Sequence, residues 1–193
     1  MELKCMNDTT KIDYGPLKQL VGTWKGDKGT DIAPDPEGSE NNPYYETIAC
    51  TAVGDVTNAE SQVLAVIRYH QVVRRKVDDE VFHDETGYWM WDAAAGMVMH
   101  SLTIPRAVCV LAGGQYSGEK NEQGDVVIEV TASTQDKNWG IIQSPFMQDN
   151  ARTTGFRHKI TLGRETLVYS ETTIVEIYGK TFEHTDTNKL MRQ

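Results

Sequence analysis

The chain lacks the features of secreted and membrane-spanning proteins. Its 193 residues include only three cysteines, which are widely spaced and form no C-x-x-C pair: Cys5, Cys50 and Cys109. An odd number of dispersed cysteines favours free thiols in a reducing compartment. No segment approaches the ~20 apolar residues of a membrane span, and the N-terminus has no apolar run of signal-peptide type. We therefore expect a cytoplasmic protein that does not enter a membrane.

Positive charge is also scarce. The chain has 19 basic and 28 acidic residues, a formal net charge of −9 that is spread along the sequence. Nucleic-acid-binding proteins gather Lys and Arg in a patch or stripe, so nucleic acid is not an expected partner. The motifs H-E-x-x-H and G-x-S-x-G are both missing, which argues against a zinc enzyme and against an α/β-hydrolase.

Residues that favour β-strands are abundant instead. Segments 61–75, 125–133 and 165–178 are rich in Val, Ile, Thr and Tyr, the residues that fit a pleated surface. Within the second segment Val126, Ile128 and Val130 share one face of the expected strand. Turn signals recur at short intervals: Gly54-Asp55, Asp78-Asp79, Gly96, Gly113-Gly114, Gly118, Gly124 and Gly163. This pattern predicts an all-β fold built as an antiparallel meander.

Two segments do not fit the strand pattern. Asp13 to Leu20 predicts one short helical turn before the first strand. Segment 31–43 is rich in Pro, Gly, Asn and acidic residues, which predicts a long irregular loop. The sequence shows no internal repeat or linker, so we expect residues 1–193 to form a single domain, large enough to bury roughly 70% of its unfolded surface.

The most informative motif is Gly22-Thr23-Trp24-Lys25-Gly26. A G-x-W motif that opens the first strand suits a small closed β-barrel, because glycine lets the strand bend and the indole plugs one end of the lumen. Barrels of this size can hold one small ligand. We therefore expect the function to reside in an interior cavity, with the long loop at its mouth.

Candidate cavity residues have two interpretations each. Neighbours on a strand point to opposite faces, so of His83, Asp84 and Glu85 only His83 and Glu85 can share one environment. His184 alone is a solvated residue or a metal ligand. Several large apolar residues could line a ring-binding pocket or form packed core: Trp89, Met90, Trp91, Met97, Met99, Ile104 and Phe156.

Three segments, taken in order along the chain, resemble the nitrobindins. They are Pro16-Leu17-x-x-Leu20-Val21-Gly22-Thr23-Trp24-x-Gly26, then Phe82-His83-x-Glu85-x-Gly87-Tyr88, then His184 with a following strand that ends Leu190-x-Arg192. Nitrobindins are haem-binding β-barrels related in shape to fatty-acid-binding proteins and lipocalins. The resemblance implies a single antiparallel up-and-down barrel of about ten strands.

The resemblance also implies ferric haem b as cofactor, with His184 as the proximal iron ligand and His83 facing the cavity. Thr23 and Trp24 fall on the family's first-strand motif, and Ile104 is expected against the ring. Family members isomerise peroxynitrite to nitrate and bind nitric oxide, with the chemistry carried by the haem iron. Partners are then haem and small nitrogen oxides, and the protein is a monomer or homodimer.

A second hypothesis is a non-enzymatic intracellular carrier of a fatty acid or another apolar small molecule. It stays open because the chain departs from the family pattern at two places. Where the family has a short Gly-rich hairpin and a Tyr-Pro-Thr-Ile segment, this chain has Asp27-Lys28-Gly29-Thr30-Asp31-Ile32-Ala33-Pro34 and then the long acidic loop. After His184, polar residues 185–188 stand where the family prefers Leu-x-Ala-x-Leu.

Overall fold

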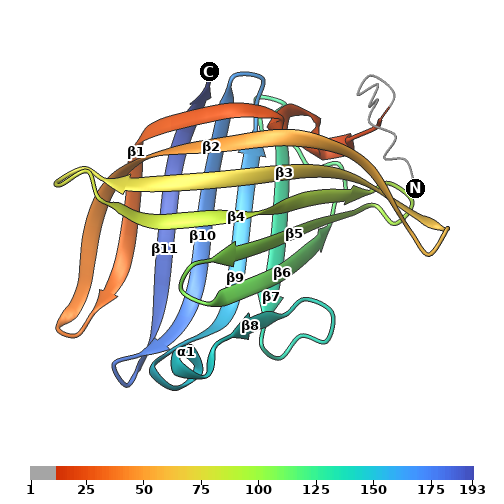
Figure 1. Cartoon of the computed structure of the whole chain (residues 1–193). Helices are drawn as coiled ribbons and strands as arrows, with labels where there is room; N and C mark the ends of the chain where they lie inside the picture. The colour runs from red at the N-terminus through yellow and green to blue at the C-terminus, as the bar shows by residue number, and fades with distance from the viewer. Residues whose placement is uncertain (1–11) are drawn as a thin grey trace, which may run out of the picture.

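Eleven strands and two short helices make up residues 12–193, the part of the chain that the computed structural model describes (Figure 1). Cys5 lies outside the described residues. The elements are η1 (Gly15–Leu20), β1 (Gly22–Asp35), β2 (Gly38–Asn58), β3 (Gln62–Arg75), β4 (Val81–Asp92), β5 (Met97–Ile104), β6 (Val108–Gln115), β7 (Val126–Ser133), β8 (Ile141–Gln143), α1 (Pro145–Asn150), β9 (Ala151–Leu162), β10 (Thr166–Ile177) and β11 (Lys180–Arg192).

The strands form one sheet that closes on itself. Its order is β5-β4-β3-β2-β1-β11-β10-β9-β7-β6-β8, and a further pairing of β5 with β6 completes the ring. Every strand pair is antiparallel, and the short strand β8 pairs with β6 at residues 108–110, whereas β7 pairs with β6 at Gly113. The fold is therefore a ten-stranded antiparallel barrel with one extra strand, as the sequence predicts.

The strongly patterned segments form the expected strands. Segments 61–75, 125–133 and 165–178 become β3, β7 and β10, each within one residue at both ends. The expected helical turn before the first strand is the 3₁₀ helix η1. Helix α1 has no counterpart among the expectations; Ser144 caps its N-terminus by accepting a hydrogen bond from the Met147 amide.

Segment 31–43 was expected as an irregular loop, and this expectation is wrong. β1 and β2 remain paired as far as Asp35 and Gly38, so the segment is a hairpin with a two-residue turn. Its backbone is held on both sides, because β1 also pairs with β11 at Asp31 and Ile32. Hydrogen bonds to two neighbouring strands thus override a composition that favours a loop.

Two of the turn signals also lie inside strands. Gly54 sits at a register shift within β2, where its φ of +118° favours glycine, and Gly113-Gly114 lies within β6. A fourth glycine, Gly29, follows a register shift in β1, and a Cβ there would overlap the ring of Tyr44. These glycines shape strands rather than end them.

One end of the barrel is filled by an apolar core. Trp24 is 0% exposed there, and its indole nitrogen donates to the Leu20 carbonyl oxygen at 2.8 Å. The Arg192 guanidinium lies 4.1 Å from the centre of the same ring and donates to the Val21 carbonyl. Each large side chain in this core stabilises the fold by roughly 1.5–3 kcal/mol. We call this the closed end of the barrel.

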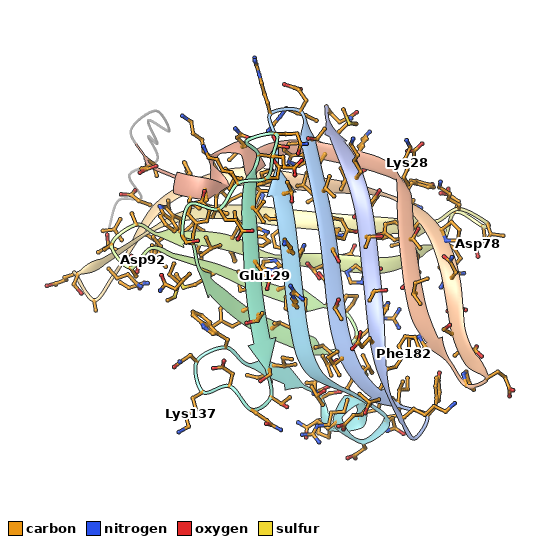
Figure 2. All side chains as sticks on the ribbon, turned by 180° about the vertical axis from the view of Figure 1, so that it is seen from behind. Lys28, Asp78, Asp92, Glu129, Lys137 and Phe182 are labelled. Carbon is orange, nitrogen blue, oxygen red and sulfur yellow. The ribbon has the colours of Figure 1, made fainter. Side chains whose placement is uncertain are left out.

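The two ends can be followed in Figure 2. Asp92, at the end of β4, marks the closed end, and Asp78, in the turn between β3 and β4, marks the opposite one. Neither helix in residues 12–193 has the length and apolar character needed to cross a membrane.

Candidate functional site

A cavity of about 380 Å³ occupies the end opposite Trp24. Residues from the tips of four connections line it: Pro34, Arg75, Arg106 and Tyr178. The cavity therefore opens at the mouth of the barrel, between the strand ends. Its volume lies in the range of sites that hold small molecules and cofactors, roughly 300–1,000 Å³.

The lining of the cavity has two chemically different sides. Strands β3 to β6 and β9 supply an apolar side, made by Val73, Phe82, Leu102, Ile104, Val108, Val110 and Phe156. Strands β1, β10 and β11 supply a polar side that includes Asp31, Glu171, His184 and Asp186. Such a cavity suits a ligand with one apolar face and a second face that meets polar groups.

The strand register explains why the polar residues gather. Asn42 of β2 pairs with Asp31 of β1, Asp31 with Asp186 of β11, Asp186 with Glu171 of β10, and Glu171 with His158 of β9. Residues directly opposite one another in an antiparallel sheet share a face. These five side chains, which we call the polar row, therefore cross five neighbouring strands on the inside of the barrel.

His184 projects from β11 two residues before Asp186 and is held by Asp31. Its Nε2 lies 2.5 Å from Asp31 Oδ1, and the other carboxylate oxygen of Asp31 accepts from Asn42 Nδ2 at 2.9 Å. Asp31 is 2% exposed. Burial works against charge on His184, but the Asp31 hydrogen bond raises its pKa above the ordinary value.

The other ring nitrogen of His184, Nδ1, has no hydrogen-bond partner among residues 12–193. Asp186 Oδ2 lies 3.5 Å from Nε2, and single ligand atoms of Asp31, His184 and Asp186 all lie within 4.8 Å of one another. Burial raises the pKa of Asp186 to about 7. The arrangement thus presents one free imidazole nitrogen, with carboxylate support for the other.

A second histidine faces the cavity from β4. His83 Nε2 lies 3.4 Å from Glu85 Oε2. Burial opposes charge on His83, but its interactions with Glu85 raise the pKa to about 9. Glu85 also accepts from the Tyr69 hydroxyl, which lies 2.8 Å from His100 Nε2. His83 therefore places positive charge at the cavity near neutral pH.

Buried polar groups form the floor between the cavity and the closed end. Glu46 is 2% exposed and accepts from Gln71 at 2.6 Å, Tyr169 at 2.9 Å and Asn188 at 2.7 Å. Burial raises its pKa to about 7, against the effect of these hydrogen bonds. His100 stacks on Trp89 at 3.9 Å, and burial lowers its pKa to about 3. His100 is therefore neutral.

Of the residues expected at the cofactor, the structure brings His184, His83 and Ile104 together around the cavity. Thr23 and Trp24 do not line the cavity. Trp24 is packed in the closed end, and Thr23 precedes it at the start of β1. The G-x-W motif therefore serves the barrel core in this chain.

The apolar candidates divide in the same way. Ile104 and Phe156 line the cavity, whereas Trp89 and Trp91 belong to the buried core. Met90, Met97 and Met99 are partly exposed and do not line it. Of the two interpretations, the pocket holds for Ile104 and Phe156 and the packed core for Trp89 and Trp91. Neither fits the three methionines, and the remaining apolar wall consists of Val73, Phe82, Leu102, Val108 and Val110.

Sequence reasoning missed Asp31, Asp186, Arg75 and Arg106. A local signal existed for Asp186, since residues at i and i+2 share a strand face and Asp186 follows His184 by two. No such signal existed for Asp31, which meets His184 across 153 positions of the chain.

Comparison with known proteins agrees with the barrel fold. The family described as THAP4-like, heme-binding beta-barrel domain matches residues 13–192. The chain belongs to this family, the nitrobindins. Among solved structures, the nitrobindin fold here is similar to "Crystal Structure of Rv2717c from M. tuberculosis", with a TM-score of 0.63 and 22% identity over 94% of this chain and 99% of that one. A search of curated proteins found no match.

The residues of this nitrobindin-family cavity fit a haem. A haem needs an axial donor atom, apolar surface for its ring and an outlet for its carboxylates. His184 Nδ1 is an imidazole nitrogen without a partner, and the opposite side of the cavity is apolar. Three of the carboxylates that line the cavity have histidine partners, which reduces their repulsion of an anionic ligand: Asp31 with His184, Glu85 with His83 and Glu171 with His158.

Proposed function

We propose that this protein binds ferric haem b in the cavity through His184 and acts on nitric oxide and peroxynitrite. The observation that carries the proposal is the hydrogen bond between His184 Nε2 and buried Asp31, which leaves the second ring nitrogen without a partner. Ligating histidines characteristically give their other nitrogen to a carboxylate or carbonyl. Membership of a haem-binding family supports the same conclusion.

Each side of the cavity has a distinct role in this proposal. Asp31, itself held by Asn42, fixes the orientation of the His184 ring and makes the imidazole a stronger donor. Phe82, Ile104 and the other apolar residues of the cavity would contact the haem ring and exclude water from it. When bound, the haem supplies the iron on which nitrogen oxides react.

His83 has an electrostatic role. Its charge, maintained by Glu85, favours an anion such as peroxynitrite or product nitrate inside a cavity that otherwise carries several carboxylates. Among the described residues, the cavity lining contains two histidines, His83 and His184, and the pKa of each is raised. His184 is the proposed iron ligand, which leaves His83 to interact with an anion. His83 is therefore the residue that we expect to set the preference for anions over neutral nitric oxide.

The carrier hypothesis rests on a specific observation too. The apolar side of the cavity suits a hydrocarbon chain as well as a ring, and the cavity volume suits either. The two complexes differ in visible absorption: a haem complex absorbs intensely in the visible range, and a complex with a colourless lipid does not. Addition of ferric haem to purified protein therefore separates them.

Stopped-flow mixing of the ferric haem complex with peroxynitrite tests the reaction. We expect faster decay than in buffer that contains the same concentration of free haem, and nitrate as the product. In His83→Asn the acceleration should fall while haem remains bound. Decay no faster than in the free-haem control would reject the isomerase function and leave haem or lipid binding.

A further inference from the structure

We propose that Arg75 and Arg106 form a binding site for the carboxylate of the cavity's ligand. This site at the mouth, the arginine pair, would pair with a haem propionate or with the head group of a fatty acid. The proposal rests on the proposed function in placing an apolar ligand in the cavity. It adds how the ligand is oriented and why it must carry a carboxylate.

Arg75 is the last residue of β3 and is preorganised by its surroundings. Its Nη1 donates to Asp78 at 2.8 Å and to Glu80 at 3.3 Å, while its guanidinium lies 5.4 Å from the centre of the Phe82 ring. Nε is buried and therefore covered by protein atoms, whereas Nη2 has no hydrogen-bond partner among residues 12–193. Nη1 thus fixes the side chain and leaves Nη2 to donate to a ligand.

Arg106 approaches the same place from the turn between β5 and β6. Its Nη2 donates to the Phe82 carbonyl oxygen at 3.0 Å, and it has no carboxylate partner among residues 12–193. Both arginines line the cavity, as does Phe82 between them. The Arg106 guanidinium therefore lies at the mouth beside an apolar wall and has no carboxylate partner. The Arg75 guanidinium lies over the ring of the same residue, Phe82.

The distribution of charge selects this place for a carboxylate. Arg75 and Arg106 are the only arginine or lysine side chains among the described residues that line the cavity, and both lie at the mouth. His83, the other cationic side chain of the lining that lies away from the polar row, is paired with Glu85. The polar row on the opposite side carries Asp31, Glu171 and Asp186, which disfavour a carboxylate there. A guanidinium forms two parallel hydrogen bonds with a carboxylate, a geometry that an ammonium group cannot match.

A ligand with an apolar body and a carboxylate can satisfy both regions at once. Its body lies against Phe82, Ile104 and their neighbours, and its carboxylate meets the arginine pair at the water-accessible mouth. Haem and long-chain fatty acids share this chemistry. Esters of the same molecules keep the apolar body and lose the charge, so they separate the contribution of the carboxylate from that of the cavity.

The test titrates wild-type protein and three variants with ferric haem and with ferric haem dimethyl ester, followed by the change in visible absorption. Wild type should bind haem more tightly than the ester. Arg75→Met and Arg106→Met should each weaken haem binding by about tenfold, the scale of a charge-assisted hydrogen bond. Neither should change binding of the ester.

Arg74→Met is the matched control. Arg74 precedes Arg75 on β3, carries the same charge, bonds to the Asp79 carbonyl and does not line the cavity. It should bind both ligands as wild type does. Arg106 is exposed, so its replacement does not disturb the core, and the ester comparison in wild type needs no substitution at all. Equal affinity of wild type for haem and its ester would overturn the proposal.

A second titration distinguishes the ligand source and separates failure of this proposal from failure of haem binding. Palmitate and methyl palmitate are titrated calorimetrically into wild type and Arg106→Met. One outcome is that haem does not bind, while palmitate binds more tightly than its methyl ester and Arg106→Met removes that difference. This result would support the arginine pair as a carboxylate site and reject the haem function. Binding of neither haem nor palmitate to wild type overturns both.

Discussion

The closed end and the mouth of the barrel use the same strands for different purposes. On β11, Leu190 is 0% exposed among apolar neighbours at the closed end, whereas His184 and Asp186 face the cavity nearer the mouth. On β4, Trp89 belongs to the core and His83 to the cavity. Between the two ends lies the floor around Glu46, whose carboxylate accepts three hydrogen bonds.

This contrast separates the source of stability from the source of function. Apolar burial at the closed end stabilises the barrel without help from the cavity. Buried charged groups can then occupy the mouth half where they have nearby partners, as Asp31 has in His184 and Asn42. Substitutions at the two ends should therefore have different consequences.

The largest effect on stability is expected from Leu190→Ala. This substitution leaves a cavity in the packed core and should lower the free energy of unfolding by about 2–5 kcal/mol. Urea denaturation measures the change. Val168→Ala, at an exposed position of β10, is the control and should change it by less than about 1 kcal/mol. Similar losses in both variants would mean that the closed end is not the stabilising core.

At the mouth, Asp31→Asn should act on the ligand. The amide cannot accept the His184 hydrogen bond as a carboxylate does, so haem affinity should fall by about 10- to 100-fold with stability little changed. Haem titration measures this, with Asp27→Asn, an exposed residue of β1, as the control. Unaltered haem affinity in Asp31→Asn would show that Asp31 does not support an iron ligand.

The floor should make stability depend on pH. The pKa of Glu46 rises from its ordinary 4.5 to about 7 in the folded protein. A raised pKa contributes stability that is present below pH 4.5 and is lost as the pH rises towards 7. Asp186, with a pKa raised from 3.8 to about 7, acts in the same direction. Urea midpoints of the haem-free protein should therefore decline over this range.

Glu46→Gln isolates the contribution of the floor, because glutamine keeps the size of the side chain but does not titrate. The difference in unfolding free energy between wild type and Glu46→Gln should change between pH 4.5 and 7, in favour of the variant at higher pH. A difference that is constant over this range would place the titration of Glu46 outside it.

The smallest effect concerns the approach of an anion to the mouth. The net charge of −9 and the acidic hairpin around Glu40 repel peroxynitrite at long range. Salt screens this repulsion, so the decay rate with the haem complex should rise with ionic strength, by less than about tenfold. Stopped-flow rates at low and high salt measure it, and a rate that falls with salt would indicate that local positive charge dominates.

The closed end could be predicted from sequence because its signals are local. Trp24 follows a glycine at the start of a strand, and Val126, Ile128 and Val130 alternate within eight residues. The cavity depends on contacts between distant segments. Asp31 meets His184 only because β1 and β11 become neighbours in the closed barrel. The composition of segment 31–43, which contains Asp31, indicated a loop instead of a strand.

The arginine pair shows the same limit. Arg75, at the end of β3, and Arg106, in the turn between β5 and β6, meet around Phe82 only after the barrel closes. Family resemblance supplied His184 and His83, and strand alternation supplied Glu85 as the neighbour of His83. Neither supplied Asp31 as the partner of His184, because the two residues are 153 positions apart. Thr23 and Trp24 were also assigned to the cofactor from the family motif, but they lie outside the cavity lining, and Trp24 has only the packing role that the G-x-W motif predicts.

One measurement tests the central claim most directly: titration of His184→Ala with ferric haem. His70→Ala is its control, because His70 is an exposed histidine of β3 outside the cavity. His184→Ala should lose most of its haem affinity and its axial-ligand spectrum while its circular dichroism and urea midpoint stay close to wild type, and His70→Ala should match wild type throughout. Unchanged haem affinity and spectrum in His184→Ala would contradict the account.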